Sequence, residues 1–171
     1  MFKSVMALAA LLGAGAACSA TFHVEDGSLP SLPAKVADAI QASASYEDFR
    51  PLRCSLVGKK LPVGPRRGDA YVATTAGSCG WGAGAGPIWV VVGAHKIPKV
   101  VLASAGNSLE IGIPGKKGLA DVATANGSAG RYLKRIWKFD GTRYVQSVEY
   151  AFSTDDPETC KAHPSHCPWR P

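Results

Sequence analysis

The chain has 171 residues, a length that fits a single folded domain. Hydrophobic residues make up 46% of it and charged residues 19%, which excludes disorder as a description of the whole chain. The formal net charge is +6, with the basic residues spread along the sequence. This balance fits a soluble surface or an anionic partner.

The first 20 residues are typical of an export signal. Lys3 supplies a positive charge, residues 5–12 form an apolar stretch, and small residues precede Thr21. The apolar stretch is shorter than the roughly 20 residues that cross a bilayer as a helix. We therefore expect cleavage before Thr21 and a periplasmic or secreted protein. Residues 15–18 also resemble a bacterial lipobox, so an outer-membrane lipoprotein anchored through Cys18 is the alternative.

After the signal, the sequence predicts a globular domain over residues 21–152 and a polar, proline-rich tail over residues 153–171. Pro33 and the spacing of Val36 and Ile40 predict one short helix over residues 33–44. From Pro51 onward, short apolar or alternating runs separated by turn residues predict strands. These runs cover residues 51–59, 69–76, 87–94, 99–104, 109–113 and 118–125.

The clearest predicted element is a hairpin over residues 131–152. Asp140-Gly141 is a dipeptide typical of two-residue hairpin turns. That turn predicts a register with Phe139 opposite Thr142, Trp137 opposite Tyr144 and Leu133 opposite Val148. The fold class that we expect is α+β and mainly β, with one N-terminal helix and an antiparallel meander sheet stabilised by disulfides.

Four cysteines follow the signal, namely Cys54, Cys79, Cys160 and Cys167. An even number in an exported chain predicts disulfide bonds. Sequence alone leaves three connectivities open, of which we favour Cys54–Cys79 and Cys160–Cys167. The second pair would close the short loop CKAHPSHC.

The stretch SCGWGAGAGPIWVV, residues 78–91, raises the question of a nucleotide site. Its glycines loosely fit a dinucleotide-binding fingerprint, but that fingerprint requires a helix after the glycine turn. Here an apolar, β-branched run follows, which predicts a strand, so we expect no nucleotide and no other cofactor. We interpret the stretch as a hairpin loop in which Trp81 is a candidate partner-binding residue. The alternative is that Trp81 folds back over the sheet.

Motifs of catalysis are absent from the sequence. Neither G-x-S-x-G nor H-E-x-x-H occurs, so we predict no catalytic residue and do not favour an enzyme. A hydrolase whose site is assembled in space is the alternative.

The tail offers the one clustered set of soft metal ligands in the sequence. Its members are Cys160, His163, His166 and Cys167. Zinc or copper would accept such ligands. In an oxidising compartment a disulfide between the two cysteines is the favoured interpretation. Metal binding through this loop is the alternative.

Three segments, SCGWGAGAGPIWVV, GLADVATANGS and IWKFDGTRY, carry a resemblance. Over residues 77–150 the chain resembles small exported proteobacterial proteins, periplasmic or lipoprotein-like, with a Gly-Cys-Gly loop, a PIWVV strand and a W-x-F-D-G-T-x-Y hairpin. The last two segments also resemble single blades of FG-GAP or VCBS-type propellers. Such loops often hold a second cysteine after the glycines, and residues 83–86 have none. The resemblance thus implies an envelope protein in which Cys79 pairs with Cys54, and it carries over no catalytic residue.

Taken together, these features favour a small exported binding module without catalysis. We expect an inhibitor, an immunity-type protein or an envelope accessory protein. Its partner would be an envelope protein or glycan. Export makes nucleic acid an unexpected partner, and contact with a membrane is expected only through lipidation of Cys18.

Overall fold

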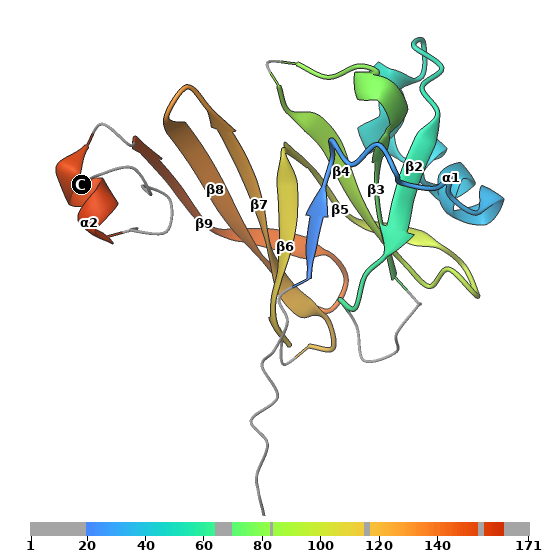
Figure 1. The fold of residues 1–171 in the computed structure, drawn as a ribbon. Helices are drawn as coiled ribbons and strands as arrows, with labels where there is room; N and C mark the ends of the chain where they lie inside the picture. The colour runs from blue at the N-terminus through green and yellow to red at the C-terminus, as the bar shows by residue number, and fades with distance from the viewer. Residues whose placement is uncertain (1–19, 64–69, 83, 115–116, 154–155, 163–171) are drawn as a thin grey trace, which may run out of the picture.

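The computed structural model describes residues 20–63, 70–82, 84–114, 117–153 and 156–162, and their strands form two antiparallel sheets (Figure 1). One sheet has the strand order β1-β6-β7-β8-β9 and the other the order β2-β3-β4-β5. The strands are Thr21–His23 (β1), Leu56–Lys60 (β2), Ala70–Thr75 (β3), Gly86–Val92 (β4), Lys99–Gly106 (β5), Ser108–Pro114 (β6), Ala120–Ser128 (β7), Arg131–Phe139 (β8) and Tyr144–Ser153 (β9). The helical elements are Ala34–Gln41 (α1), Ala44–Phe49 (η1, a 3-10 helix), Ala76–Ser78 (η2, a 3-10 helix) and Pro157–Ala162 (α2).

The expected fold class, mainly β with antiparallel pairing and a short helix, is confirmed. The division into two sheets is not apparent from the sequence. The chain passes from one sheet to the other at a tight turn between β5 and β6. A side chain would not fit at Gly106 in this turn, because its Cβ would lie 2.6 Å from the Ala125 carbonyl oxygen. Asn107 then bonds to β7 and to the residue that follows β1. Its backbone N–H donates to Ala125 O at 2.7 Å, and its carbonyl accepts from Val24 N at 3.0 Å.

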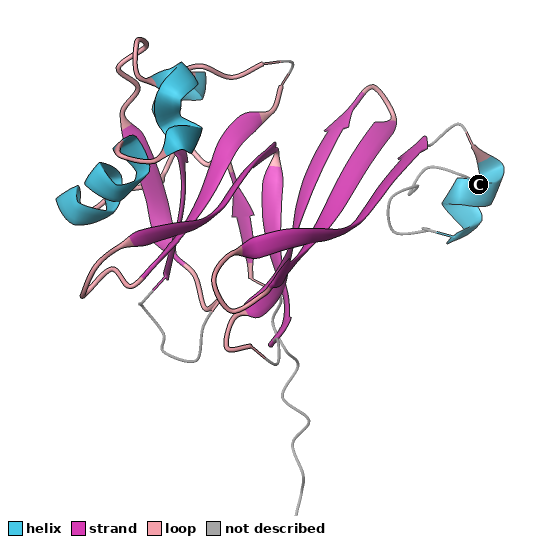
Figure 2. Cartoon of the chain, turned by 180° about the vertical axis from the view of Figure 1, so that it is seen from behind, coloured by secondary structure: helices cyan, strands magenta, loops and turns pink. Residues whose placement is uncertain are grey.

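The predicted N-terminal helix is α1, and it covers the outer face of the four-stranded sheet together with η1 (Figures 1 and 2). Val36 and Ile40 are 1% and 0% exposed, as their spacing predicts. They pack with Trp89 of β4, whose indole Nε1 donates to Ser45 Oγ at 3.1 Å. The helical layer is thus fixed to the sheet by apolar burial and one side-chain hydrogen bond.

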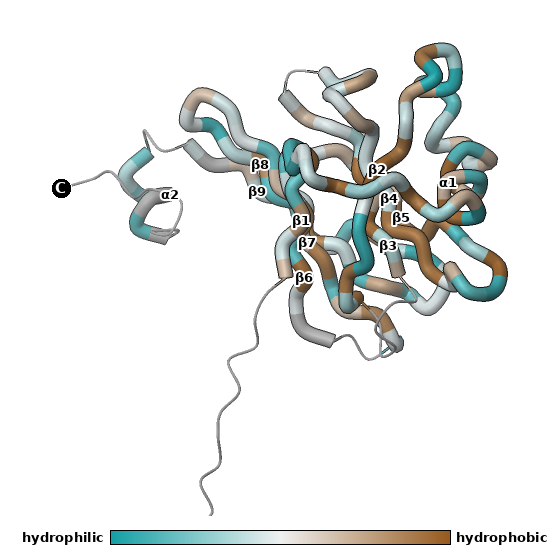
Figure 3. The backbone as a smooth tube through the Cα atoms, turned by 45° about the vertical axis from the view of Figure 1, so that its right-hand side comes forward, coloured by the Kyte–Doolittle hydropathy of each residue, from teal (hydrophilic) through white to brown (hydrophobic). Residues whose placement is uncertain are grey.

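Strand β4 is buried on both faces, which explains its unbroken apolar sequence. Ile88 and Val90 face the core between the two sheets, while Trp89 and Val91 face the helical layer. Figure 3 shows apolar stretches gathered around the four-stranded sheet and α1, with more hydrophilic stretches at β8 and β9. The central strand therefore joins two apolar cores in one chain segment.

The disulfide Cys54–Cys79 is confirmed, with a Cα–Cα distance of 5.7 Å. It links the segment after η1 to the loop after η2. The predicted export signal, residues 1–20 with Cys18, lies outside the described residues apart from Ala20. The predicted Cys160–Cys167 pair also lies outside what the structure describes, although the backbone of Cys160 belongs to α2.

The predicted register of the last hairpin is wrong. Phe139 pairs with Tyr144, so the loop has four residues instead of two. The Asp140 side chain explains the wider loop, because its Oδ1 accepts the backbone N–H groups of Thr142 at 2.7 Å and of Arg143 at 2.8 Å. The Asp140 N–H also donates to Arg143 O at 2.9 Å.

A bulge shifts the register again between Ile136 and Trp137. Trp137 pairs with Gln146, whereas Ile136 pairs with Val148, so the register passes over Ser147. The outcome beyond the bulge is that Leu133 faces Ala151, not Val148. Beyond such a bulge, the residues of one strand that had pointed to one face of the sheet point to the other. A pattern of alternating residues does not show where this change occurs.

No helix within the described ranges is both long enough and apolar enough to cross a membrane.

Candidate functional site

Trp81 lies in the glycine loop before β4, and its indole folds back toward the protein. The ring Nε1–H donates to Thr75 Oγ1 at 2.8 Å, and the Thr75 hydroxyl donates to the carbonyl oxygen of Cys79 at 2.7 Å. Gly86 provides the space for the ring, since a Cβ there would lie 2.7 Å from the indole Cε2. The side chain is half-buried and packs against the core between the sheets.

The loop that carries Trp81 is held in a conformation that favours glycine. Gly77, Ser78 and Gly80 have φ values of 58°, 59° and 71°. Gly80 also packs closely on η1, because a Cβ at this position would lie 2.8 Å from Phe49 Cδ1. With the disulfide at Cys79, these constraints fix the direction in which the indole points.

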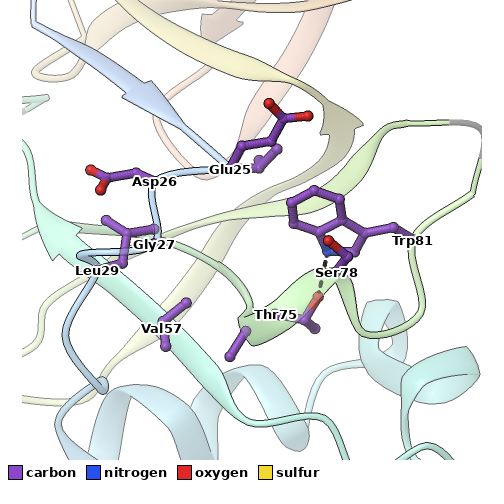
Figure 4. A pocket seen from close by; sticks show the side chains of 11 residues that line it. Glu25, Asp26, Gly27, Leu29, Val57, Thr75, Ser78 and Trp81 are labelled. Atoms are coloured by element: carbon purple, nitrogen blue, oxygen red, sulfur yellow. Dashed lines mark hydrogen bonds between the residues drawn. The ribbon is translucent and has the colours of Figure 1, made fainter.

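A cavity of about 150 Å³ opens beside the indole (Figure 4). The segment that follows β1 forms one side of it, and the loop with Trp81 forms the other. Its lining residues are Val24, Glu25, Asp26, Gly27, Leu29, Val57, Thr75, Ala76, Gly77, Ser78 and Trp81. A cavity of this size holds about one six-membered ring, and it is smaller than the usual site for a whole metabolite. We call it the Trp81 cavity.

Asp26 is one of two carboxylates at the Trp81 cavity, and its interactions keep it ionised. Its Oδ1 accepts the hydroxyl and the backbone N–H of Ser28, at 2.5 Å and 3.0 Å. These hydrogen bonds hold the pKa of the Asp26 carboxyl below its ordinary value of 3.8, and the charge of Lys59 adds to the effect. Lys59 Nζ lies 3.8 Å from Asp26 Oδ2.

Glu25 is the second carboxylate, and its situation is different. Its side chain is exposed, and it makes neither a hydrogen bond nor an ion pair within the described ranges. Figure 4 shows Glu25 and Trp81 on the rim of the same cavity, with Val57 and Thr75 beneath. The cavity therefore combines an aromatic ring with a carboxylate that has no ion pair among the described residues.

A wider cavity of about 430 Å³ lies on the outer face of the five-stranded sheet. We call it the sheet groove. It is lined by His23, Glu25, Asn107, Ser108, Glu110, Ala125, Asn126, Gly127, Tyr132, Leu133 and Lys134. His23 and Ser108 are direct partners in the β1–β6 ladder. Within the part of the chain that the structure describes, no hydrogen bond joins these two side chains, so the hydrolase alternative stays a prediction.

The metal alternative also stays a prediction. No group of three or more His, Cys, Asp or Glu side chains in the described ranges is placed to hold a metal ion. The predicted ligands His163, His166 and Cys167, and the side chain of Cys160, lie outside those ranges.

Sequence patterns single out Trp81 but not the groups around it. Thr75 sits in an ordinary alternating strand, and nothing in its neighbours marks it as the acceptor for an indole. Glu25-Asp26-Gly27-Ser28 is recognisable as a turn, because Asp and Ser are typical turn residues. Its position beside Trp81 depends on packing between segments more than 50 residues apart.

No family model, curated protein or solved structure matches this chain. The resemblance to small exported envelope proteins therefore stays a prediction.

Proposed function

We propose that this protein is an exported binding module without catalysis, and that its Trp81 cavity takes one cationic side chain of a partner protein. The observation that carries the proposal is the placement of the Glu25 carboxylate and the Trp81 ring on one cavity of about 150 Å³. Cations are attracted both to a carboxylate and to the face of an indole, tryptophan being the strongest aromatic partner.

The hydrogen bond from Trp81 to Thr75 supports this use of the ring. The indole has one polar group, its N–H, and that group already donates inward at 2.8 Å. Hence the ring needs no further polar partner and can present its π-system to a ligand. Because the ring is fixed before binding, little side-chain entropy is lost when the cation arrives.

Charge supports the same conclusion. The chain as a whole has a formal net charge of +6, whereas the ionisable groups that line this cavity, Glu25 and Asp26, are both acidic. A basic partner would be repelled by the net positive charge of the chain and attracted at this cavity, which orients the encounter. Asp26 already has Lys59 nearby, so we assign the direct contact to Glu25.

The expected side chain is arginine in preference to lysine. A guanidinium group forms bidentate hydrogen bonds with a carboxylate and stacks flat on an aromatic ring, whereas an ammonium group is compact and strongly hydrated. The cavity is too small for a whole metabolite but suits a single inserted side chain. The partner would thus present one arginine on a protruding loop or terminus.

A titration with a capped Gly-Gly-Arg-Gly-Gly peptide tests the proposal. We expect saturable heat of binding that weakens with added salt, because an exposed ion pair is screened. Glu25→Gln should weaken binding by about tenfold, since it replaces a charge-assisted contact with a neutral one. Asp38→Asn is the matched control, because it makes the same charge change at an exposed position of α1 away from the cavity.

Two results would overturn the proposal. One is equal binding of the same peptide with citrulline, the neutral isostere, in place of arginine. The other is a loss of affinity in Asp38→Asn as large as that in Glu25→Gln, which would reduce the effect to net charge.

A further inference from the structure

The sheet groove lies away from the helical layer of the molecule. Figures 1 and 2 place α1 and η1 on the four-stranded sheet, and α2 beyond the end of β9. The groove faces outward from β1, β6, β7 and β8. It shares only Glu25 with the Trp81 cavity.

The floor of the sheet groove is formed by Ala125, a small residue of β7. Ala125 lies between Ser108 of β6 and Lys134 of β8 in the strand register, and Gly127 lies beside Tyr132. Side chains that point to one face of a sheet alternate along each strand, so these five share the outer face. Ala125 leaves a depression between its taller neighbours Ser108 and Lys134, while the Tyr132 ring covers Gly127.

An ion pair closes one end of this depression. Lys134 Nζ lies 2.7 Å from Glu110 Oε2, which joins β8 to β6 across the small residues of β7. The Lys134 side chain is only 16% exposed. Its charge is therefore compensated inside the groove, while its remaining ammonium protons and the second Glu110 oxygen can still bond to a polar ligand.

Tyr132 supplies a flat apolar surface at the other end. A Cβ on Gly127 would lie 2.5 Å from Tyr132 Cδ1 and 2.7 Å from Cε1, so the ring lies directly over the glycine.

The chemistry of the groove is mixed but nearly uncharged. It offers hydroxyl, imidazole, ammonium and carboxylate groups beside one aromatic ring, and these groups belong to Ser108, His23, Lys134, Glu110 and Tyr132. The lysine is neutralised by Glu110, and Glu25 remains at the rim, so an anionic ligand would find no uncompensated lysine or arginine among the described lining residues. An apolar ligand would leave these polar groups unpaired.

We propose that the sheet groove binds a neutral saccharide. A sugar ring has hydroxyl groups that donate and accept hydrogen bonds around its edge and C–H groups that can lie on a tyrosine face. The volume of about 430 Å³ falls within the range of small-molecule sites. This binding is separate from the capture of an arginine side chain at the Trp81 cavity.

Calorimetric titration with two neutral probes tests the proposal, a tetrasaccharide of N-acetylglucosamine and one of glucose. We expect at least one of them to bind, and Ala125→Leu to abolish that binding by filling the floor of the groove. Ala34→Leu is the matched control, because it adds the same side chain at an exposed position of α1. Circular dichroism and thermal unfolding of both variants confirm that each is folded.

A second pair of variants, which remove one hydroxyl group each, tests the proposal if Ala125→Leu disturbs the sheet. Ser108→Ala should weaken saccharide binding by about threefold to tenfold, the cost of one hydrogen bond. Ser147→Ala, at an exposed position of β9 outside the groove, should leave it unchanged.

Three outcomes would overturn the assignment: no binding of either neutral tetrasaccharide by the wild-type protein, equal binding by folded Ala125→Leu, or stronger binding of a polygalacturonate tetrasaccharide, which is anionic. The arginine peptide separates the two sites. Its binding to Ala125→Leu should equal that to the wild type whatever the saccharide result.

Discussion

The indole Nε1 of Trp81 donates a 2.8 Å hydrogen bond to the Thr75 hydroxyl, which ties the glycine loop to the end of β3. Thr75 is 1% exposed, so its oxygen is a fixed acceptor. The contact explains why a tryptophan in a glycine-rich loop does not swing into solvent. It also determines which surface of the ring remains for a ligand.

Replacing Thr75 tests that contact. Thr75→Val keeps the shape of the side chain but leaves the indole N–H without its acceptor, and we expect the free energy of unfolding to fall by about 1–3 kcal/mol. Thr75→Ser retains a hydroxyl and should lose less. Urea unfolding of the two variants measures the difference, and equal stability of Thr75→Val and the wild type would show that the bond is unimportant.

The glycines of the loop allow a second test. Gly86→Ala would place a Cβ 2.7 Å from the indole and force Trp81 to move, whereas a Cβ added at Gly82 would meet no atom within 4 Å. We expect Gly86→Ala to cost about 1–3 kcal/mol in unfolding free energy and to weaken arginine-peptide binding. Gly82→Ala should stay within about 0.5 kcal/mol of the wild type. A similar loss in both would point to loop entropy instead of the clash.

Removal of the disulfide should lower the free energy of unfolding and also free the loop that carries Trp81. Cys54 and Cys79 are separated by 25 residues, a loop length for which the chain-entropy model gives about 3–4 kcal/mol. We expect the double alanine variant to unfold at lower urea concentration and its tryptophan emission to shift toward that of exposed indole. An unchanged midpoint with unchanged emission would mean that the loop is held by packing alone.

The hairpin loop provides a prediction on pH. The backbone N–H groups of Arg143 and Thr142 hold the pKa of the Asp140 carboxyl below its ordinary value of 3.8. Because the pKa of Asp140 is lower in the folded state, its ionised carboxylate stabilises the loop at pH values above the ordinary pKa. This contribution is lost as the pH falls through the lower pKa of the folded state. The amide signals of Thr142 and Arg143, followed by NMR from about pH 6 to about pH 2, should therefore change with a midpoint below 3.8. A midpoint at or above 3.8 would contradict the two hydrogen bonds.

Local patterns in the sequence predict those parts of the fold that depend on local physics. The spacing of Val36 and Ile40 is sufficient for α1, and the apolar run after Pro87 is sufficient for β4. In contrast, the register of the last hairpin depends on Asp140, whose side chain competes with a two-residue turn by binding two backbone amides. A dipeptide preference contains no information on that competition.

The candidate sites are less accessible to sequence analysis because they join distant segments. Trp81 is recognisable in the sequence by its position among glycines. Its proposed role, however, depends on Thr75 and on Glu25, and Glu25 lies more than 50 residues earlier in the chain. The sheet groove depends on strand order, since Lys134 and Glu110 meet only because β6, β7 and β8 are neighbours. Neither arrangement has a signature in one continuous stretch.

The most direct test of the central claim is the indole N–H spectrum during titration with the Gly-Gly-Arg-Gly-Gly peptide. The chain has four tryptophans, and their indole signals can be assigned by single Trp→Phe variants. Binding at the Trp81 cavity predicts a saturable shift of the Trp81 Nε1–H signal and none for Trp89, which is 1% exposed. A peptide that saturates the protein while the Trp81 signal stays in place would contradict the account.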